Sequence, residues 1–240
     1  MTKSIEPQYT RVIVKFTGEI FRDGDNYLSE NAAVLAAKEI KEACDLGLQV
    51  AVVLGGGNIV RGRNFANSKL LEATSADYMG MVATIINGIM FEGVLRAHGV
   101  EPRLMSALAI KSVAEDYLYK VARSHLEKGR VVIRVGGSGQ PNFTTDATAI
   151  LMAEDLKADA VLKATKVDGV FDKDPMVYPD AKLLPEVTAE QVWHMNLKVI
   201  ERSALVGERH RVPIHVFNIF KPGNLKRLLL GEPIGSRIVF

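Results

Sequence analysis

The chain has 240 residues, of which 48% are hydrophobic, 24% charged and 7% aromatic. That length is enough for one α/β domain with a full core, so we expect residues 1–240 to form a single domain. The formal net charge is only +2, which disfavours nucleic acid or an anionic membrane as the main partner, although a few local cations can still bind a small anion.

Short β-branched runs alternate along the chain with longer segments of helical periodicity. Six apolar runs are predicted to be strands, at 11–16, 49–54, 102–105, 130–135, 158–164 and 213–218. The predicted helices cover 29–46, 75–98, 112–128, 146–156, 197–210 and 222–230, with Ser29 and Ser75 as candidate N-caps. Near-continuous apolar runs are typical of parallel strands that are covered on both faces. The alternation therefore predicts a three-layer α/β/α sandwich with a mostly parallel central sheet.

The predicted helix at 75–98 is apolar around most of its circumference, from Met79 to Leu95. A helix of this kind is buried on more than one side. The pattern fits a subunit interface and a central core helix equally well.

Two glycine-rich turns directly follow predicted strands, Gly55–Asn58 after the second strand and Gly136–Gly139 after the one at 130–135. Glycine lets backbone N–H groups approach an anion closely, and parallel strands present their carboxyl ends at one edge of the sheet. Each turn alone could equally be a tight strand-to-helix connection. Together they indicate a ligand with two phosphate groups, or two phosphate-bearing ligands.

Two common nucleotide motifs are absent from these turns. Neither turn ends in Gly-Lys-Ser or Gly-Lys-Thr, so neither is a P-loop. Val60 stands where a dinucleotide fingerprint needs its third glycine, and Asp77, at the distance of a ribose-binding acid, begins a predicted helix and does not end a strand.

Lys15, Lys163 and Lys166 lie at the ends of apolar strands. A lysine in such a strand is costly unless it points toward an anion at the strand end. Phosphoryl transfer needs cations of this kind, because they neutralise the charge on the transferred group. In the segment 163–175, Phe171 could stack on a base and Asp174 could accept from a ribose hydroxyl.

From about residue 9 to 240 the chain resembles the bacterial uridylate kinases of the amino-acid-kinase superfamily. The matching motifs are Lys15–Glu19, Gly55–Asn58 with Arg61-Gly62, Asp77–Met81, Gly137–Asp146, Lys163–Pro175, and Phe217-Asn218 with Lys221–Leu225. The resemblance implies transfer of the ATP γ-phosphate to UMP in pyrimidine nucleotide biosynthesis. Asp77 and the block Thr144–Asp146 distinguish this family from kinases of amino acids or carbamate.

The resemblance also implies roles for individual residues. The catalytic residues would be Lys15, Asp146, Lys163 and Glu201. ATP would bind Lys15, Phe16, Thr17, Gly18, Gly57, Arg61, Thr165, Phe171 and Asp174. UMP would bind Gly56, Asp77, Ser138, Gly139, Gln140, Pro141, Asn142, Phe143, Thr144 and Thr145.

The sequence departs from the family pattern at three places. Glu201 replaces an aspartate, so its carboxylate reaches one methylene further, and Gln140 and Asn142 replace Asn and Phe in the UMP segment. The stretch 23–28, which is tied to the GTP response in the family, lacks most of the family's glycines. We therefore expect GTP to have little effect on the rate.

Further expectations concern partners and compartment. The resemblance implies a homohexamer inhibited by UTP, with Mg²⁺ arriving on ATP, and the five histidines show no metal-ligand spacing, so no dedicated metal site is predicted. The lone Cys44, the lack of an N-terminal apolar run and the lack of about 18 uninterrupted apolar residues predict a cytoplasmic protein. Two alternatives stay open: a kinase of the same fold acting on a carboxylate or carbamate, and a nucleotide-binding assembly without catalysis.

Overall fold

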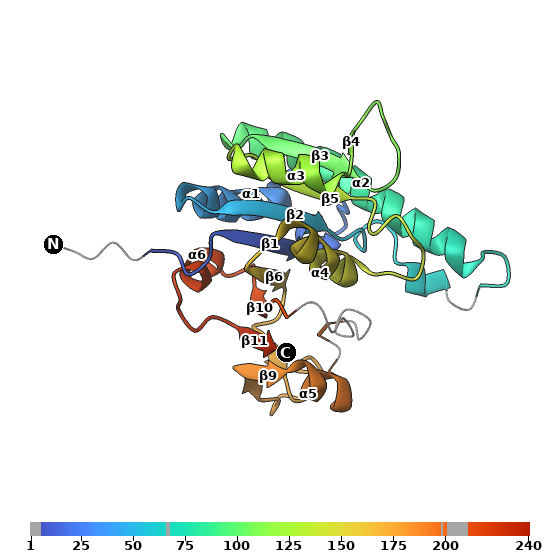
Figure 1. Ribbon diagram of the computed structural model, residues 1–240. Helices are drawn as coiled ribbons and strands as arrows, with labels where there is room; N and C mark the ends of the chain where they lie inside the picture. Colours follow the sequence, from blue (N-terminus) through green and yellow to red (C-terminus); the bar gives the residue numbers. More distant parts are fainter. Residues whose placement is uncertain (1–5, 66–67, 198, 201–210) are drawn as a thin grey trace.

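The computed structural model describes residues 6–65, 68–197, 199–200 and 211–240. Its helices and strands form three layers around one central sheet (Figure 1). Over these residues the sheet has nine strands in the order β4-β3-β5-β2-β1-β6-β10-β11-β9, and its neighbours pair in parallel except for β10 with β11. The expected three-layer sandwich with a mostly parallel sheet is thus confirmed.

The sheet strands of the described residues comprise six that agree closely with the predicted runs and three, of two to four residues, that were not predicted. They are β1 Arg11–Phe16, β2 Gln49–Leu54, β3 Pro102–Ser106, β4 Glu115–Asp116, β5 Val131–Val135, β6 Ala160–Thr165, β9 Glu186–Thr188, β10 Ile214–Asn218 and β11 Ser236–Val239. A separate hairpin pairs β7 Val170–Phe171 with β8 Leu183–Leu184.

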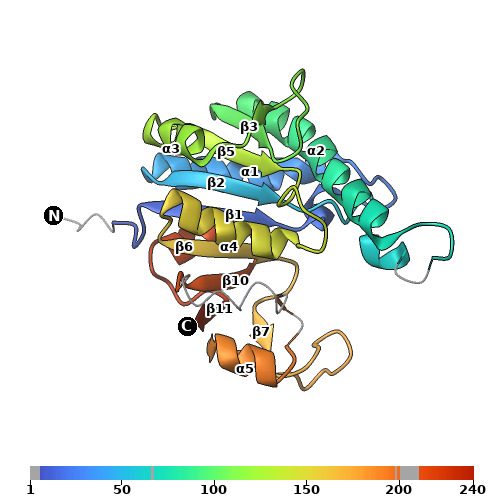
Figure 2. The ribbon, with the colours of Figure 1, turned by 45° about the vertical axis from the view of Figure 1, so that its right-hand side comes forward.

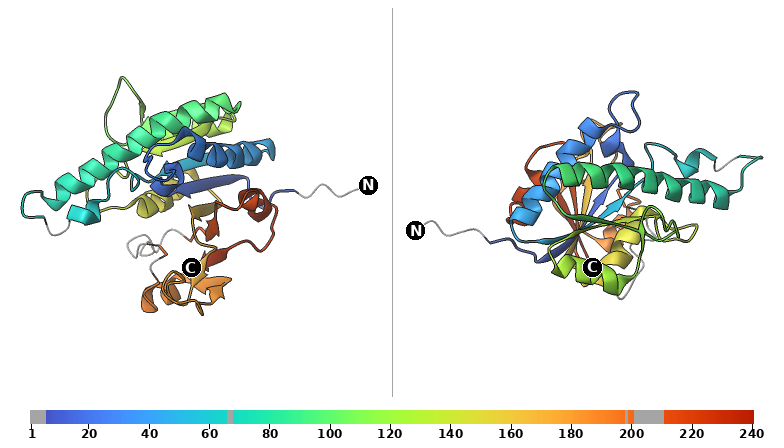
Figure 3. Two further views of the ribbon diagram at one scale, coloured as in Figure 1. Left: turned by 180° about the vertical axis from the view of Figure 1, so that it is seen from behind. Right: turned by 90° about the horizontal axis from the view of Figure 1, so that it is seen from above.

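The α-helices are α1 Glu30–Asp45, α2 Ala73–Ala97, α3 Tyr119–Glu127, α4 Thr145–Leu156, α5 Ala189–His194 and α6 Asn224–Leu229, with short 3-10 turns η1 Gly18–Phe21 and η2 Gly62–Phe65. Helices α3 and α4 lie over one face of the sheet (Figure 2), and α1 and α2 over the other (Figure 3).

Alternate residues of the central strands belong to two different apolar cores, one on each face of the sheet. In β1, Val12, Val14 and Phe16 pack with α1, α2 and α6, whereas Ile13 packs with α3 and α4. Because successive side chains of a strand point to opposite faces, Lys15 lies on the α4 face. The strand alternation therefore decides on which side of the sheet the lysines lie.

Of the five predicted helices that the described residues cover, four begin within two residues of the prediction and one does not. Ser29 caps α1 as expected, accepting from the backbone N–H of Ala32 at 3.3 Å. Ser75 is not an N-cap, because α2 begins at Ala73. The predicted helix at 112–128 is correct only from Tyr119 onward, since residues 115–116 pair with β3 as an edge strand. The predicted helix at 197–210 falls mostly outside the described residues.

Helix α2 has one buried and one exposed face. Its 25 residues make it the one helix in the described ranges that could cross a membrane by length and composition, yet 44% of its most apolar stretch is buried within the molecule. Thr84, Asn87 and Phe91 are buried, whereas Val82 and Ile89 are 46% and 47% exposed. Within the single chain one side of α2 is exposed, so α2 is not a central core helix, and the subunit-interface interpretation stays a prediction.

Candidate active site

Three charged side chains meet where β1 and β6 end. Lys15 and Lys163 are register partners on these neighbouring strands and point to the same face. The Asp146 carboxylate, in the first turn of α4, lies between them, with its Oδ1 2.8 Å from Lys15 Nζ and its Oδ2 bonded to Lys163 Nζ. These side chains are no more than 11% exposed. The predicted lysines and the predicted aspartate are thus brought together.

The charge state of this cluster follows from its surroundings. Burial alone would raise the pKa of the Asp146 carboxyl, but the adjacent charges of Lys15 and Lys163 outweigh burial and hold that pKa well below its ordinary value. Asp146 is therefore an anion near neutral pH, and its lowered pKa makes it a weak base. With two cations and one anion, the cluster keeps one net positive charge for a phosphate.

The cluster lies at the switch point of the sheet. From β1 the strand order runs one way through β2, β5 and β3, and from β6 it runs the other way through β10. Ligands of open α/β sheets bind outside the carboxyl ends of the strands at such a point. A cavity of about 480 Å³ opens there and is lined by Lys15, both glycine turns and the N-terminal half of α2.

The glycines at the floor of this cavity are required by close packing. A Cβ on Gly18 would lie 2.3 Å from Asn58 Oδ1 and 2.7 Å from the backbone N of Gly57. A Cβ on Gly56 would lie 2.7 Å from the carbonyl oxygen of Gly80 in α2. Only glycine fits at these contacts, and the approach leaves backbone amides available to an anion.

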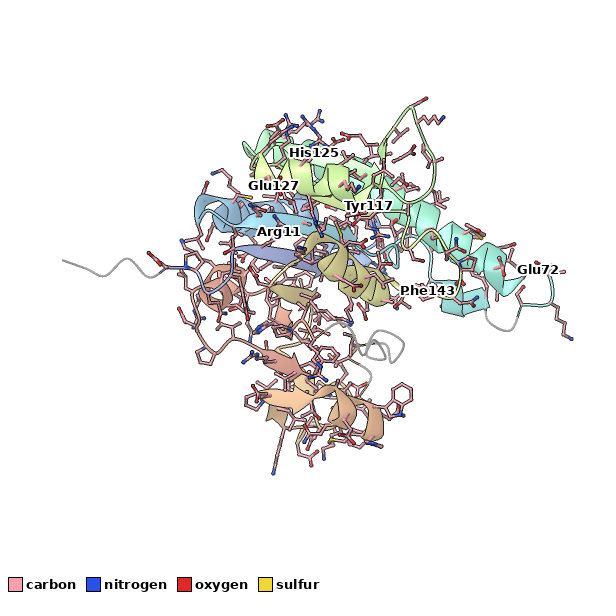
Figure 4. All side chains as sticks on the ribbon, in the orientation of Figure 1. Arg11, Glu72, Tyr117, His125, Glu127 and Phe143 are labelled. Atoms are coloured by element: carbon pink, nitrogen blue, oxygen red, sulfur yellow. The ribbon has the colours of Figure 1, made fainter. Side chains whose placement is uncertain are left out.

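The second turn uses glycine for its backbone conformation. Gly136, Gly137 and Gly139 have φ of 75°, 57° and 80°, in the left-handed region that favours glycine. Its far end is held by Asp77, whose Oδ2 accepts from the backbone N–H of Asn142 at 2.8 Å. Phe143 lies between α4 and the N-terminal part of α2 (Figure 4). Gly137 and Phe143, near the two ends of this segment, thus line the cavity together with the first turn.

Arg61 and Glu19 form an ion pair at the rim of the cavity. An Arg61 terminal nitrogen donates to Glu19 Oε1, and Arg61 Nε donates to the carbonyl of Gly57 at 3.0 Å. The two side chains are 38% and 30% exposed. A phosphate entering the cavity could therefore exchange with Glu19 for the guanidinium.

A second cavity, of about 650 Å³, lies beyond the end of β6. Apolar and aromatic side chains line it, among them Phe171, Tyr178 and Leu197, together with Asp174. Asp168, between the lining residues Val167 and Gly169, connects this cavity to the end of β10. Its Oδ1 accepts from Asn218 Nδ2 at 3.1 Å and lies 2.7 Å from Lys221 Nζ. Such a pocket suits an aromatic base next to the phosphate site.

The predicted site residues divide into three groups by position. Those lining the first cavity are Lys15, Thr17, Gly18, Gly56, Gly57, Arg61, Asp77, Phe143, Thr144 and Thr145, and those lining the second are Phe171 and Asp174. Thr165, at the end of β6, and residues 138–142, between β5 and α4, line neither cavity. Glu201 lies outside the described residues.

Phe16 lies away from the cavities, and several residues outside the predicted set line the first cavity. The Phe16 side chain packs on Phe91 in the core, so it could meet a nucleotide only through its backbone. Glu19, Val60, Met81 and Thr84 line the first cavity although sequence reasoning did not select them. Glu19 and Met81 belong to the Lys15–Glu19 and Asp77–Met81 motifs and could have been predicted, whereas Val60 and Thr84 lie in no motif that points to the site.

Comparison with known protein families and sequences gives matches over most of the chain. Residues 10–218 match the model of the amino acid kinase family. Over 224 residues the chain is 43% identical to a uridylate kinase of Sulfurovum sp. (strain NBC37-1), covering 92% of this chain and 95% of the relative. Over 225 residues it is 44% identical to a uridylate kinase of Helicobacter hepaticus, with the same two coverages.

Solved structures give the same result. The UMP kinase from Bacillus anthracis superposes with a TM-score of 0.91 at 36% identity, covering 96% of each chain. The UMP kinase from Ureaplasma parvum gives 0.89 at 30% identity, covering 97% of this chain and 100% of the other.

Proposed function

The chain belongs to the uridylate kinases of the amino acid kinase family, and from this premise we propose that it transfers the γ-phosphate of ATP to UMP. The products are UDP and ADP, in pyrimidine nucleotide synthesis. The observation that carries the proposal is the Lys15–Asp146–Lys163 cluster at the switch point, directly beside a cavity with two glycine turns. Cations next to backbone amides are what phosphoryl transfer requires.

The two cavities suggest how the nucleotides are placed. We assign the adenine and ribose of ATP to the second cavity, near Phe171 and Asp174, with the triphosphate running past Thr165 to the lysines. UMP takes the first cavity, where Asp77 accepts from the ribose hydroxyls and where Phe143, Thr144 and Thr145, at the end of the predicted UMP segment, line the wall. The γ-phosphate of ATP and the phosphate of UMP then meet at Lys15.

The reaction is a direct displacement. An oxygen of the UMP phosphate forms a bond to the γ-phosphorus while the bond from that phosphorus to the β–γ bridging oxygen breaks, and ADP leaves with the electron pair. The attacking oxygen already carries negative charge, so no base has to remove a proton. Lys15 and Lys163 stabilise the charge on the transferred group, and Asp146 fixes the positions of both ammonium groups.

Magnesium is expected to enter with ATP. Among the described residues no three His, Cys, Asp or Glu side chains are close enough together to hold a metal ion, and both Asp146 oxygens contact lysines. Mg²⁺ prefers a few oxygen ligands plus water and phosphate oxygens. The ion would arrive bound to ATP and would neutralise part of the phosphate charge.

Self-association in the cytoplasm is part of the same proposal, with the homohexamer that the resemblance implies as its form. The support is the exposed face of α2, where Tyr78, Met79, Val82, Ile86 and Ile89 are each at least 38% exposed. A contiguous apolar face on a helix is typical of an interface between subunits. A cytoplasmic location is consistent with the single Cys44, a thiol whose burial raises its pKa to about 11.

Regulation by nucleotides is proposed in two parts. UTP should inhibit, because its uridine and α-phosphate can occupy the UMP cavity. GTP should change the rate less than about twofold, since the loop at 23–28 carries Asp23 and Asp25 in place of glycines and would repel a triphosphate.

The test is a coupled assay of ADP release with ATP and Mg²⁺ against a panel of acceptors. UMP should be preferred over CMP, dTMP and AMP, while carbamate and amino acids should give no ADP above the acceptor-free rate. A preference for carbamate or an amino acid would replace the proposal with another activity of the same fold. Binding of ATP and UMP without any ADP release would indicate a nucleotide-binding assembly.

A further inference from the structure

Helix α2 holds both glycine turns through side chains on its buried face. Asp77, Thr84 and Asn87 follow one another at intervals of seven and three residues, which places them on one side of a helix. Each of them bonds to the backbone of a turn at the cavity. Asp77 is already assigned to UMP. The other two lie deeper, with Thr84 2% and Asn87 0% exposed.

Thr84 holds the start of the second turn. Its Oγ1 accepts from the backbone N–H of Gly136 at 2.7 Å and donates to the carbonyl of Met81 at 2.7 Å. Gly136 directly follows β5 and has φ of 75°. The Thr84 hydroxyl therefore fixes the point where the UMP segment leaves the sheet.

Asn87 holds the first turn through a reciprocal amide pair. Its Nδ2 donates to Asn58 Oδ1 at 2.8 Å, and Asn58 Nδ2 donates to Asn87 Oδ1 at 2.9 Å. Asn87 Nδ2 also donates to the carbonyl of Gly55 at 2.8 Å, and Asn58 Nδ2 donates to that of Tyr27 at 2.7 Å. These two carbonyls require nitrogen at both positions, so they fix the orientation of both amides.

We propose that Thr84 and Asn87 are positioning residues for the kinase reaction, each acting on a different glycine turn. Thr84 positions the segment that receives UMP, and Asn87 positions the Gly55–Asn58 turn that both nucleotides approach. The inference rests on the proposed function. Neither side chain need touch a substrate. Removing one of these side chains leaves a buried backbone group of the turn without its hydrogen-bond partner, and that cost is sufficient to displace the turn.

The test compares Thr84→Val, which keeps the shape but removes the hydroxyl, with Thr84→Ser, which retains it. We expect Thr84→Val to raise KM for UMP about five- to tenfold, the effect of one buried donor left without a partner. KM for ATP should stay within about twofold of wild type, and Thr84→Ser should restore KM for UMP to near the wild-type value. Asn87→Ala should raise both KM values. Calorimetric binding of UMP without ATP should weaken in parallel in Thr84→Val.

The control is Leu95→Ala, which creates a cavity in the core on the same helix, since Leu95 is fully buried there. It should lower Tm at least as much as Thr84→Val while leaving both KM values unchanged. Equal KM for UMP in folded Thr84→Val and wild type would overturn the proposal, as would KM changes of the same kind in Leu95→Ala. Thr84→Ala replaces the valine variant if that one does not fold. A wild-type protein that makes no UDP would instead refute the proposed function.

Discussion

Lys15 and Lys163 lie side by side because they are register partners on β1 and β6. Lys15 lies one residue before the end of β1, and Lys163 lies two residues before the end of β6. Their position at a sheet edge could be predicted, since lysine in an apolar strand is otherwise costly. Their meeting with Asp146 could not be predicted from the residues alone, because it depends on how α4 crosses the sheet. Here only the resemblance to a family pointed to the aspartate.

Asp77→Asn should separate the two substrates. The substitution removes the charge that accepts from the backbone N–H of Asn142 and that we propose to accept from the ribose of UMP. Hydrogen bonds to charged groups contribute about 1.5–3 kcal/mol, so KM for UMP should rise at least about tenfold while KM for ATP changes little. Initial rates against each nucleotide measure both constants. Asp174→Asn is the matched control and should raise KM for ATP instead; equal changes in both constants for Asp77→Asn would give that residue a purely structural role.

His215 should make stability fall in weak acid. Burial, with a smaller effect from the charge of Arg237, lowers the pKa of His215 to about 4, and Tyr9 Oη lies 2.8 Å from its Nε2. A histidine with a lowered folded pKa is neutral in both states above about pH 6.5, and below that only the unfolded chain takes up the proton. Stability should therefore decrease from about pH 6.5 to about pH 4, by up to about 3 kcal/mol.

Urea unfolding of wild type and His215→Gln across that range measures the effect. The difference in unfolding free energy between the two proteins should shrink as the pH falls. A difference that stays constant from pH 7 to pH 4 would show that His215 takes up its proton equally well in the folded protein.

The longer elements could be predicted and the short ones could not. The strands β1 and β2 have the predicted bounds, because an apolar run of six residues is a strong signal. The elements β9, β11 and α5 have three, four and six residues, too few to show periodicity, and tertiary pairing decides them. The glycine turns could be predicted from composition. The contacts of Thr84 and Asn87 with these turns could not be predicted, because they depend on the path of α2.

The exposed face of α2 should mediate self-association. Ile86→Glu places a charge in the middle of this face, where burying it would be costly, so the variant should dissociate to smaller species. Val121→Glu on α3 is the control, because Val121 is 37% and Ile86 39% exposed. Sedimentation velocity measures the masses. Unchanged association of Ile86→Glu, or equal dissociation of both variants, would exclude this face as the specific interface.

The whole molecule places its chemistry at a single point of the sheet. Strand order reverses between β1 and β6, both glycine turns follow strands that end at the same edge, and the two cavities open on that edge. The sandwich could be predicted from strand–helix alternation, but the strand order could not, because alternation does not say on which side of β1 each later strand is added. The location of the switch point thus became visible only in the fold.

The most direct measurement is the formation of UDP from ATP and UMP, separated and quantified by chromatography, for wild type and Lys15→Ala. Lys41→Ala serves as a control, since Lys41 lies on the surface of α1 and pairs only with Asp45 among the contacts of the described residues. Wild type and Lys41→Ala should produce UDP and ADP in equal amounts, while Lys15→Ala should be slower by about 10²–10³-fold with both nucleotides still bound. No UDP from the wild-type protein, or a rate of Lys15→Ala within about threefold of wild type, would contradict transfer at this cluster.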